Sequence, residues 1–290
     1  KDRGVDLPRT LLHAGRHIGT WRQSLRRLRE VIAHTQPDLV LNFFGPLMGL
    51  LQAIRPLPVP VLSVAHQFAL LGSASGAPAA APMAPWWLRG FIRMVGCRSW
   101  KMALSFTPGD ATSHSPRRVI VAPPLLRRRI RSLTPQDGDY TLVYVATHGY
   151  SEVVRSWHAE HPEVRLHCFC DRPGAPKVEV VDPNLSFHAL DGEEFIRLMA
   201  GCRAVMCTAG FESVCEAAFL GKAVLMVPLE NHHEQRLNAI DAELAGVAVS
   251  HPVFDMDALD LLPTRVENEW FRAWCAQGDA KLLETLELVV

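Results

Sequence analysis

The segment from Cys207 to Ala217 combines a predicted strand end, a turn of small residues and the start of a predicted helix. Thr208 and Ser213 place hydroxyl groups on the two sides of this turn. A turn that leads into a helix also presents backbone N–H groups that have no partner within the helix. Hydroxyls and free N–H groups at a helix N-terminus suit a phosphate group. The spacing therefore predicts a phosphate-binding turn.

Carboxylate and amide side chains occur close to this turn in the sequence. Glu216 lies about one and a half turns into the predicted helix, where its carboxylate can accept hydrogen bonds from two vicinal hydroxyls, such as those of a ribose. The next predicted strand ends at Val227, a polar loop follows, and Glu234 and Gln235 open another helix. Loops of this kind lie at the carboxyl edge of a parallel sheet, where ligands of open α/β folds bind. The pattern indicates a ligand with several hydroxyl groups.

Each of these side chains also has a structural interpretation. Thr208 and Ser213 can cap the helix, which is compatible with binding phosphate at the same place. Glu234 sits favourably in a first helical turn without any ligand. Glu216 alone is equally well a helix carboxylate, and its occurrence within the ordered block favours a binding role.

Composition excludes several classes of function. Thirty basic and thirty acidic residues cancel, so no overall field recruits nucleic acid, and we expect no nucleic-acid partner. The seven cysteines lie mostly in apolar surroundings, which is typical of reduced thiols in a cytosolic protein. We find no signal peptide and no apolar run of about 18 residues, so nothing argues for export or for spanning a membrane. We expect a cytoplasmic location.

Metal binding and a cofactor are not expected. Adjacent histidines such as His232 and His233 diverge on most backbones, and no acidic or histidine partner follows at ligand spacing. Cys168 and Cys170 lack a second cysteine pair at zinc-site spacing.

The length of 290 residues exceeds one typical core and predicts two domains. Short apolar strands alternate with helices in both halves, which indicates an α/β fold with parallel sheets. The charged, Pro- and Gly-containing stretch from Arg127 to Gly138 separates the halves. We assign residues 1–132 to an N-terminal domain, 133–265 to a C-terminal domain and 266–290 to a closing helical segment. No strand with a Gly-rich loop precedes Leu39, so we expect the N-terminal domain to be incomplete.

The individual elements follow from short apolar runs and helical periodicity. Predicted strands span residues 39–44, 59–65, 119–122, 142–146, 164–170, 185–188, 204–207 and 223–227. Predicted helices span residues 25–34, 86–101, 151–160, 192–200, 211–220, 234–245 and 270–288.

The residues from about Asp139 to Ser250 resemble the C-terminal half of two-domain GT-B glycosyltransferases. The resemblance rests on an ordered set that no single motif provides, namely residues 208–213, Glu216, residues 222–228, and Glu234–Gln235 with Asn238. The likeness is greatest to the bacterial enzymes that add N-acetylglucosamine to the peptidoglycan lipid intermediate, and to related glycosyltransferases. It implies a GT-B fold, with two Rossmann-like doubly wound domains facing a cleft.

The same resemblance implies an activity. A sugar would move from a nucleotide diphosphate sugar, UDP-linked in this family, to a hydroxyl of a glycan or lipid-linked acceptor. The transfer would be inverting and independent of metal. Glu216 would hold the donor ribose, and Glu234 and Gln235 would read hydroxyls of the donor sugar. The diphosphate would lie against Thr208, Gly210 and Ser213.

Other positions match the family less fully. His148 and Gly149 occupy the place of the family's phosphate loop but depart from its Gly- and Ser-rich form. Leu190 would contact the base through its backbone. His66 and Gln67 correspond to a His-Glu-Gln-Asn run on the acceptor side, although the intervening acid is missing. His66 would be the catalytic base and Gln67 an acceptor contact. A structural histidine at a strand end is the alternative for His66.

Two segments have alternative interpretations. The helix that begins at Trp86-Trp87 is either a membrane-contacting amphipathic helix beside the acceptor site or an interior helix packed on the first sheet. The former would place the protein on the inner face of the plasma membrane. The basic run Arg127–Arg131 is either a patch for phosphate or anionic lipid or a solvated hinge.

Competing functions on the same fold remain open. A sugar-nucleotide epimerase would need acid–base carboxylates and a basic phosphate clamp, and the Thr208–Glu216 turn contains no arginine. A nucleotide-sugar-binding protein without catalysis is the alternative from another class. Dinucleotide-dependent oxidoreduction is disfavoured, because no Gly-x-Gly-x-x-Gly follows any predicted strand.

Overall fold

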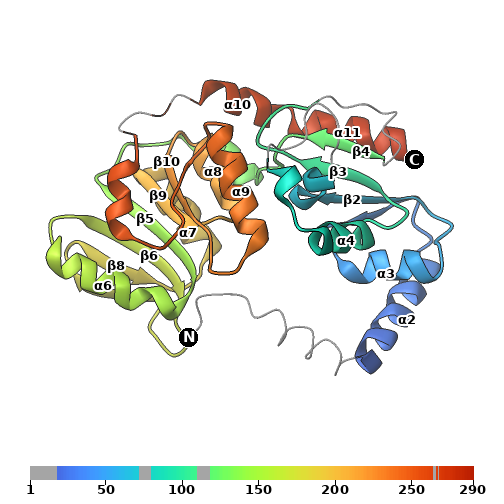
Figure 1. The fold of residues 1–290 in the computed structure, drawn as a ribbon, viewed down its shortest axis with the longest axis horizontal. Coiled ribbons are helices and arrows are strands. Elements are labelled where there is room, and N and C mark those ends of the chain that lie inside the picture. The colour runs from blue at the N-terminus through green and yellow to red at the C-terminus, as the bar shows by residue number, and fades with distance from the viewer. Residues whose placement is uncertain (1–17, 72–79, 110–117, 264–265, 267) are drawn as a thin grey trace. The chain divides into compact units, whose positions relative to one another are not determined.

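A computed structural model of the chain describes residues 18–71, 80–109, 118–263, 266 and 268–290 (Figure 1). The chain forms two compact units. Among the described residues, 126–275 form the C-terminal unit, and those from 18 to 125 together with 276–290 form the N-terminal unit. The division at 125/126 lies seven residues before the boundary that the sequence indicates, and the last helix belongs to the N-terminal unit.

The C-terminal unit is built on a seven-stranded sheet with the order β11-β10-β9-β5-β6-β8-β7. All neighbouring strands are parallel except the edge strand β7, which runs antiparallel to β8. The strands are β5 (Tyr140–Thr147), β6 (Arg165–Asp171), β7 (Val178–Asp182), β8 (Leu185–His188), β9 (Ala204–Thr208), β10 (Ala223–Val227) and β11 (Val249–Ser250).

The chain changes direction across this sheet between β5 and β9. It first adds β6 and β8 on one side of β5, and then returns to add β9, β10 and β11 on the other side. This is the order of a doubly wound dinucleotide-type fold, in which ligands bind outside the carboxyl ends of the strands at the point of reversal. In this fold, the loops after β5, β8, β9 and β10 are the expected position of a ligand.

The helices of this unit connect parallel strands, and the central strands carry the core. All five residues of β9 and all five of β10 are buried, as expected of strands covered on both faces. The helices are α5 (Arg128–Ser132), α6 (Ser151–Glu160), α7 (Gly192–Gly201), α8 (Phe211–Phe219), α9 (His233–Leu244) and α10 (Glu269–Ala276), with short 3-10 turns at His148–Tyr150 and Met256–Leu261.

The N-terminal unit contains a four-stranded sheet in the order β1-β2-β3-β4, and every neighbouring pair is parallel. Its strands are β1 (Val40–Asn42), β2 (Val61–Ala65), β3 (Trp100–Leu104) and β4 (Val119–Ala122). Its helices are α2 (Ile18–Thr35), α3 (Pro46–Ile54), α4 (Trp86–Val95) and α11 (Gly278–Val289), with 3-10 segments at His66–Leu71 and Ala81–Met83.

Close packing of α3 on α4 requires Gly49. A Cβ atom at this position would lie 2.1 Å from the carbonyl oxygen of Met94 and 2.5 Å from that of Val95. Neither backbone atom can give way, so any larger residue would push the two helices apart.

Several elements differ from the sequence-based expectation. The helix predicted to reach residue 101 ends at Val95, and Trp100 begins β3, which lies between β2 and β4. The edge strand β7 was not expected, and the last predicted helix is two helices divided at Gln277. Pairing with neighbouring strands decides β3 and β7, because local propensity is a weak guide where tertiary contacts dominate.

Candidate functional site

The turn after β9 presents the N-terminus of α8 without a capping side chain. Thr208 is the last residue of β9, and the backbone N–H of Gly210 donates to its carbonyl oxygen at 2.6 Å. Gly210 is the N-cap of α8 and, as a glycine, supplies no capping side chain. The hydroxyl of Ser213 lies 3.8 Å from the Cβ position of Gly210. The strand end, the turn and the start of the helix thus occur where the sequence predicted them.

Asn238 of α9 holds this turn from behind. Its side-chain N–H donates to the carbonyl oxygen of Ala209 at 3.1 Å, and the residue is 1% exposed. The sequence indicated Asn238 only as a companion of Gln235. This hydrogen bond links the loop after β9 to α9, the helix that follows β10. The two loops that the sequence assigns to the site are therefore joined by a direct contact.

Glu216 is buried, and its carboxylate is paired with Arg127. The guanidinium Nε lies 2.6 Å from Oε1 and the Nη2 lies 2.5 Å from Oε2, so both oxygens are engaged by one side chain. The hydrogen bond to Glu216 raises the pKa of Arg127 above its usual value. From the sequence, Arg127 is recognised only as part of a basic run. No spacing rule connects it to Glu216, which lies 89 positions away.

The loop between β10 and α9 is ordered by its own side chains. The side-chain oxygen of Gln235 accepts from the backbone N–H of Leu229 at 2.8 Å. His232 is the N-cap of α9, and its Nδ1 accepts from the backbone N–H of Gln235 at 3.2 Å. Glu234 lies half-buried in the first turn. Gln235 therefore shapes the loop with its side-chain oxygen.

The loop after β8 carries an exposed apolar residue and leads into a capped helix. Leu190 is 50% exposed. Asp191 is the N-cap of α7 and accepts from the backbone N–H groups of Glu193 and Glu194. Gly192 is the first residue of α7, and a Cβ atom added to it would lie 3.8 Å from Nη1 of Arg127. Arg127 thus extends from Glu216 to the loop that holds Leu190.

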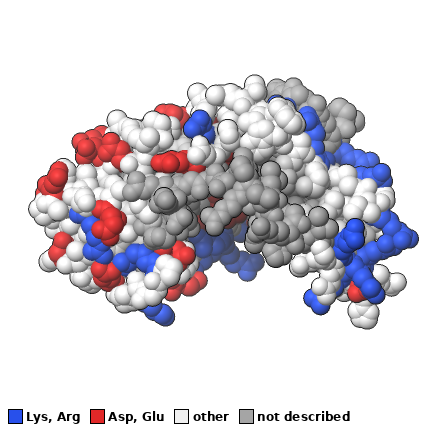
Figure 2. Space-filling model, turned by 60° about the horizontal axis from the view of Figure 1, so that its bottom comes forward, with Lys and Arg blue, Asp and Glu red and all other residues white. Residues whose placement is uncertain are grey.

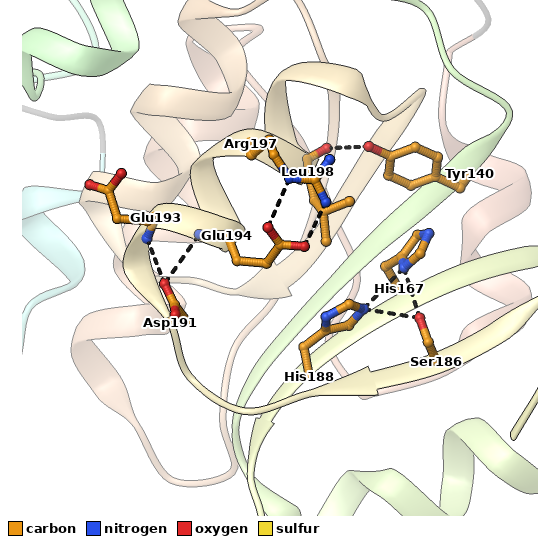
Figure 3. Close-up of polar contacts among 9 residues, drawn as sticks. All are labelled: Tyr140, His167, Ser186, His188, Asp191, Glu193, Glu194, Arg197 and Leu198. Carbon is orange, nitrogen blue, oxygen red and sulfur yellow. Dashed lines mark hydrogen bonds and ion pairs between the residues drawn. The ribbon is translucent and has the colours of Figure 1, made fainter. Parts of the chain in front are cut away.

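A cluster of two histidines and a serine lies beneath this loop (Figure 3). The hydroxyl of Ser186 lies 2.7 Å from His167 Nδ1 and 3.0 Å from His188 Nε2, and the two ring nitrogens are 3.1 Å apart. Burial and the neighbouring His188 lower the pKa of His167 to about 4. Burial also lowers the pKa of His188. Burial therefore favours the neutral form of both rings at pH 7.

This cluster was not expected from the sequence. The signal that could have found it is the alternation of polar and apolar residues in β6 and β8, which places His167, Ser186 and His188 on one face of the sheet.

Residues after β5 complete the carboxyl edge. His148 begins the short 3-10 turn after β5, and its side chain lies outside the described part of the chain. Gly149 is half-buried in the same turn. Since β5 pairs with β9, the turn follows the strand next to the one that ends at Thr208.

His66 and Gln67 lie in the N-terminal unit, at the carboxyl end of β2. His66 is 4% exposed, and its Nδ1 donates to the carbonyl oxygen of Leu104 at 2.7 Å. A carbonyl only accepts, so the proton lies on Nδ1 and the lone pair on Nε2, which is the form that a general base requires. The ring also packs edge-on against Phe106 at 5.4 Å. Gln67 is half-buried.

The surface of the N-terminal unit is basic and partly apolar. Trp86 at the start of α4 is 84% exposed, and Phe91 of the same helix and Phe43 after β1 are also exposed. The same helix contains Arg89 and Arg93. Among the charged side chains visible in Figure 2, Lys and Arg predominate over this unit, whereas basic and acidic side chains are mixed over the C-terminal unit.

Membrane-spanning and metal-binding features are absent from the residues that the structure describes. None of their helices combines the length and apolar character needed to cross a bilayer. No three His, Cys, Asp or Glu residues among them gather in a way that could hold a metal ion.

The family model for glycosyl transferase family 1 matches residues 1–265. The chain belongs to this family. A match that covers both units establishes the protein as a glycosyltransferase. A comparison with curated protein sequences finds no match.

Solved glycosyltransferase structures share the fold at low sequence identity. The glycosyltransferase of kitacinnamycin has a TM-score of 0.59 at 17% identity, over 91% of this chain and 79% of that one. MurG from Acinetobacter baumannii has a TM-score of 0.53 at 18% identity, over 93% and 77% of the two chains. UGT89C1 from Arabidopsis thaliana, a structure complexed with UDP, has a TM-score of 0.54 at 12% identity, over 94% and 74%. The GT-B fold is common to these proteins and to this chain.

Proposed function

We propose that the C-terminal unit binds a nucleotide diphosphate sugar and that the protein transfers its sugar to an acceptor hydroxyl. The observation that carries the proposal is the uncapped N-terminus of α8 at the Thr208–Ser213 turn, with Glu216 further along the same helix. A diphosphate fits the first feature, and a ribose fits the second. Both lie at the carboxyl edge of the sheet, where the chain reverses direction.

The chemistry follows from where charge develops. As the sugar leaves, negative charge accumulates on the diphosphate, and donors fixed before the reaction stabilise it. The N–H groups of α8 and the hydroxyls of Thr208 and Ser213 serve this purpose without a metal ion. Glu234 and the amide of Gln235 hold hydroxyls of the donor sugar. The sugar passes through an oxocarbenium-like state and is attacked from the opposite face, with inversion.

The N-terminal unit supplies the acceptor side of this proposal. His66 carries a lone pair on Nε2 and removes the proton of the attacking hydroxyl, and Gln67 contacts the acceptor. The acceptor is a glycan or a lipid-linked molecule. We propose UDP as the nucleotide, and a solved structure of the same fold that is complexed with UDP supports this choice.

A lipid-linked acceptor is supported by the exposed aromatic residues and arginines of α4, which are suited to the headgroup region of a membrane. We propose a peripheral contact at this helix. Co-sedimentation with anionic vesicles tests it.

Calorimetric titration of the purified chain with UDP, in the absence of added metal, tests the donor site. ADP and GDP serve as controls for base selectivity. We expect selective UDP binding that weakens at least tenfold in Glu216→Gln, since a hydrogen bond to a charged group contributes about 1.5–3 kcal/mol. The matched control is Glu212→Gln, one helical turn earlier and exposed. Failure of the wild-type chain to bind any of these nucleotides would overturn the donor-site proposal, and unchanged affinity in Glu216→Gln would remove the ribose assignment.

A further inference from the structure

Glu216 is buried and paired with Arg127, and binding of a ribose does not by itself require this pairing. The residue is 4% exposed, whereas its partner Arg127 keeps 47% of its side chain in contact with solvent. A carboxylate that is removed from water without a partner is strongly destabilised as a charged group. The two hydrogen bonds from Arg127 supply that partner.

The geometry of the pair also fixes the plane of the carboxylate. One guanidinium fork contacts both oxygens, and this bidentate arrangement sets direction as well as charge. Each carboxylate oxygen has about two acceptor positions, so the fork leaves roughly one on each oxygen. Two parallel acceptor positions on adjacent oxygens match a pair of vicinal hydroxyls.

The surroundings show that Arg127 is directed at Glu216 in particular. Its neighbour Arg129 pairs with Glu193 in the first turn of α7, so the basic run is divided between two acids. The exposed Glu212 lies near enough to Arg127 to contribute to its raised pKa, but it takes no part in the bidentate contact. Arg127 also lies beside Gly192, next to the loop with Leu190. The guanidinium therefore stands between the position assigned to the base and the carboxylate assigned to the ribose.

We propose that Arg127 is a positioning residue for donor recognition, which holds the Glu216 carboxylate in an orientation that selects the ribose over a deoxyribose. This inference rests on the donor site proposed above. It assigns to a residue at the start of the C-terminal unit a share in nucleotide selectivity.

The test compares the affinity of the chain for UDP and for 2′-deoxy-UDP in wild type, Arg127→Gln and Arg127→Lys. We expect wild type to prefer the ribonucleotide by about tenfold or more, the worth of one charge-assisted hydrogen bond. In Arg127→Gln the preference falls to within about twofold, and Arg127→Lys, which keeps the charge without the fork, recovers part of it. The matched control is Arg128→Gln, an exposed arginine one position later, which retains the full preference.

The outcomes separate the inference from the proposed function. An Arg127→Gln variant that keeps the wild-type preference would overturn the inference. Wild-type binding of UDP without any ribose preference would do the same and leave the donor site standing. No nucleotide binding by wild type would overturn both.

A second measurement needs no ligand. Thermal unfolding of Arg127→Gln, Glu216→Gln and the double variant measures the coupling of the pair. We expect each single change to lower the unfolding temperature and the double variant to be no less stable than Arg127→Gln, because Arg127→Gln leaves a buried charge that Glu216→Gln removes. Additive effects would show that the two side chains act independently and would contradict the inference.

Discussion

The carboxyl ends of the two sheets lead into different loops, although the strand-end residues Thr208, His188 and His66 are all buried. In the C-terminal unit, the strand ends at Thr208 and His188 lead into loops with an open helix N-terminus and an exposed Leu190. In the N-terminal unit, His66 follows β2 in the corresponding position, but its ring turns inward to the carbonyl oxygen of Leu104. A strand-end position is therefore not sufficient to identify a surface-exposed group. The direction of the side chain depends on the packing around it.

The surfaces differ in the same sense. The C-terminal unit carries mixed charges, many of them in pairs such as Arg197 with Glu194. The N-terminal unit exposes the aromatic side chain of Trp86, and its helix α2 contains four arginines and one glutamate. This difference suits a division in which one unit recognises a small polar donor and the other meets an amphipathic acceptor.

The largest expected effect is the loss of sugar transfer in His66→Gln. This variant tests the role of the histidine at the end of β2. A glutamine amide can still donate to Leu104, but it cannot accept a proton, and general-base catalysis contributes about 10²–10⁴-fold to rate. We expect sugar transfer to fall at least 100-fold while UDP affinity stays within about twofold. The rate of UDP release from the UDP-sugar in the presence of acceptor measures the first, and calorimetry the second. Full activity would assign His66 to the core alone.

A smaller effect is expected for Trp86→Ser in vesicle binding. Transfer of one large apolar side chain from water contributes about 1.5–3 kcal/mol, so partitioning onto anionic vesicles should weaken by about tenfold or more. Val180→Ser is the matched control, since Val180 is a 70% exposed apolar residue of the C-terminal unit. Equal loss in both variants, or none in Trp86→Ser, would remove the membrane contact from α4.

The smallest effect concerns the histidine cluster beneath the Leu190 loop. The pKa of His167 is lowered to about 4, below the ordinary value near 6.5 that it has in the unfolded chain. The unfolded state therefore binds more protons than the folded state between these values, and stability is lost as the pH falls from about 6.5 to about 4. His167→Gln should reduce this loss in thermal unfolding, whereas replacement of the exposed His34 by Gln should not. An unchanged pH dependence in His167→Gln would show that the cluster does not oppose protonation.

Much of the C-terminal unit is predictable because its signals are local. The strand at Leu185–His188 and the strand at Ala223–Val227 were predicted with the bounds that the structure shows. The first alternates apolar and polar residues, and the second is a short apolar run. The strand β3 was not, because the apolar residues after Trp100 continue a helical pattern and become a strand only by pairing with β2 and β4.

The sequence by itself determined which strand ends carry hydroxyl, carboxylate and amide groups, because order along the chain and the alternation of strands and helices place them at one edge of a parallel sheet. Only the tertiary structure decided that Arg127 meets Glu216, that Asn238 holds Ala209, and that His66 is buried. These contacts join residues that lie far apart in the chain. Their formation depends on how the elements pack, and no periodicity in the sequence records that.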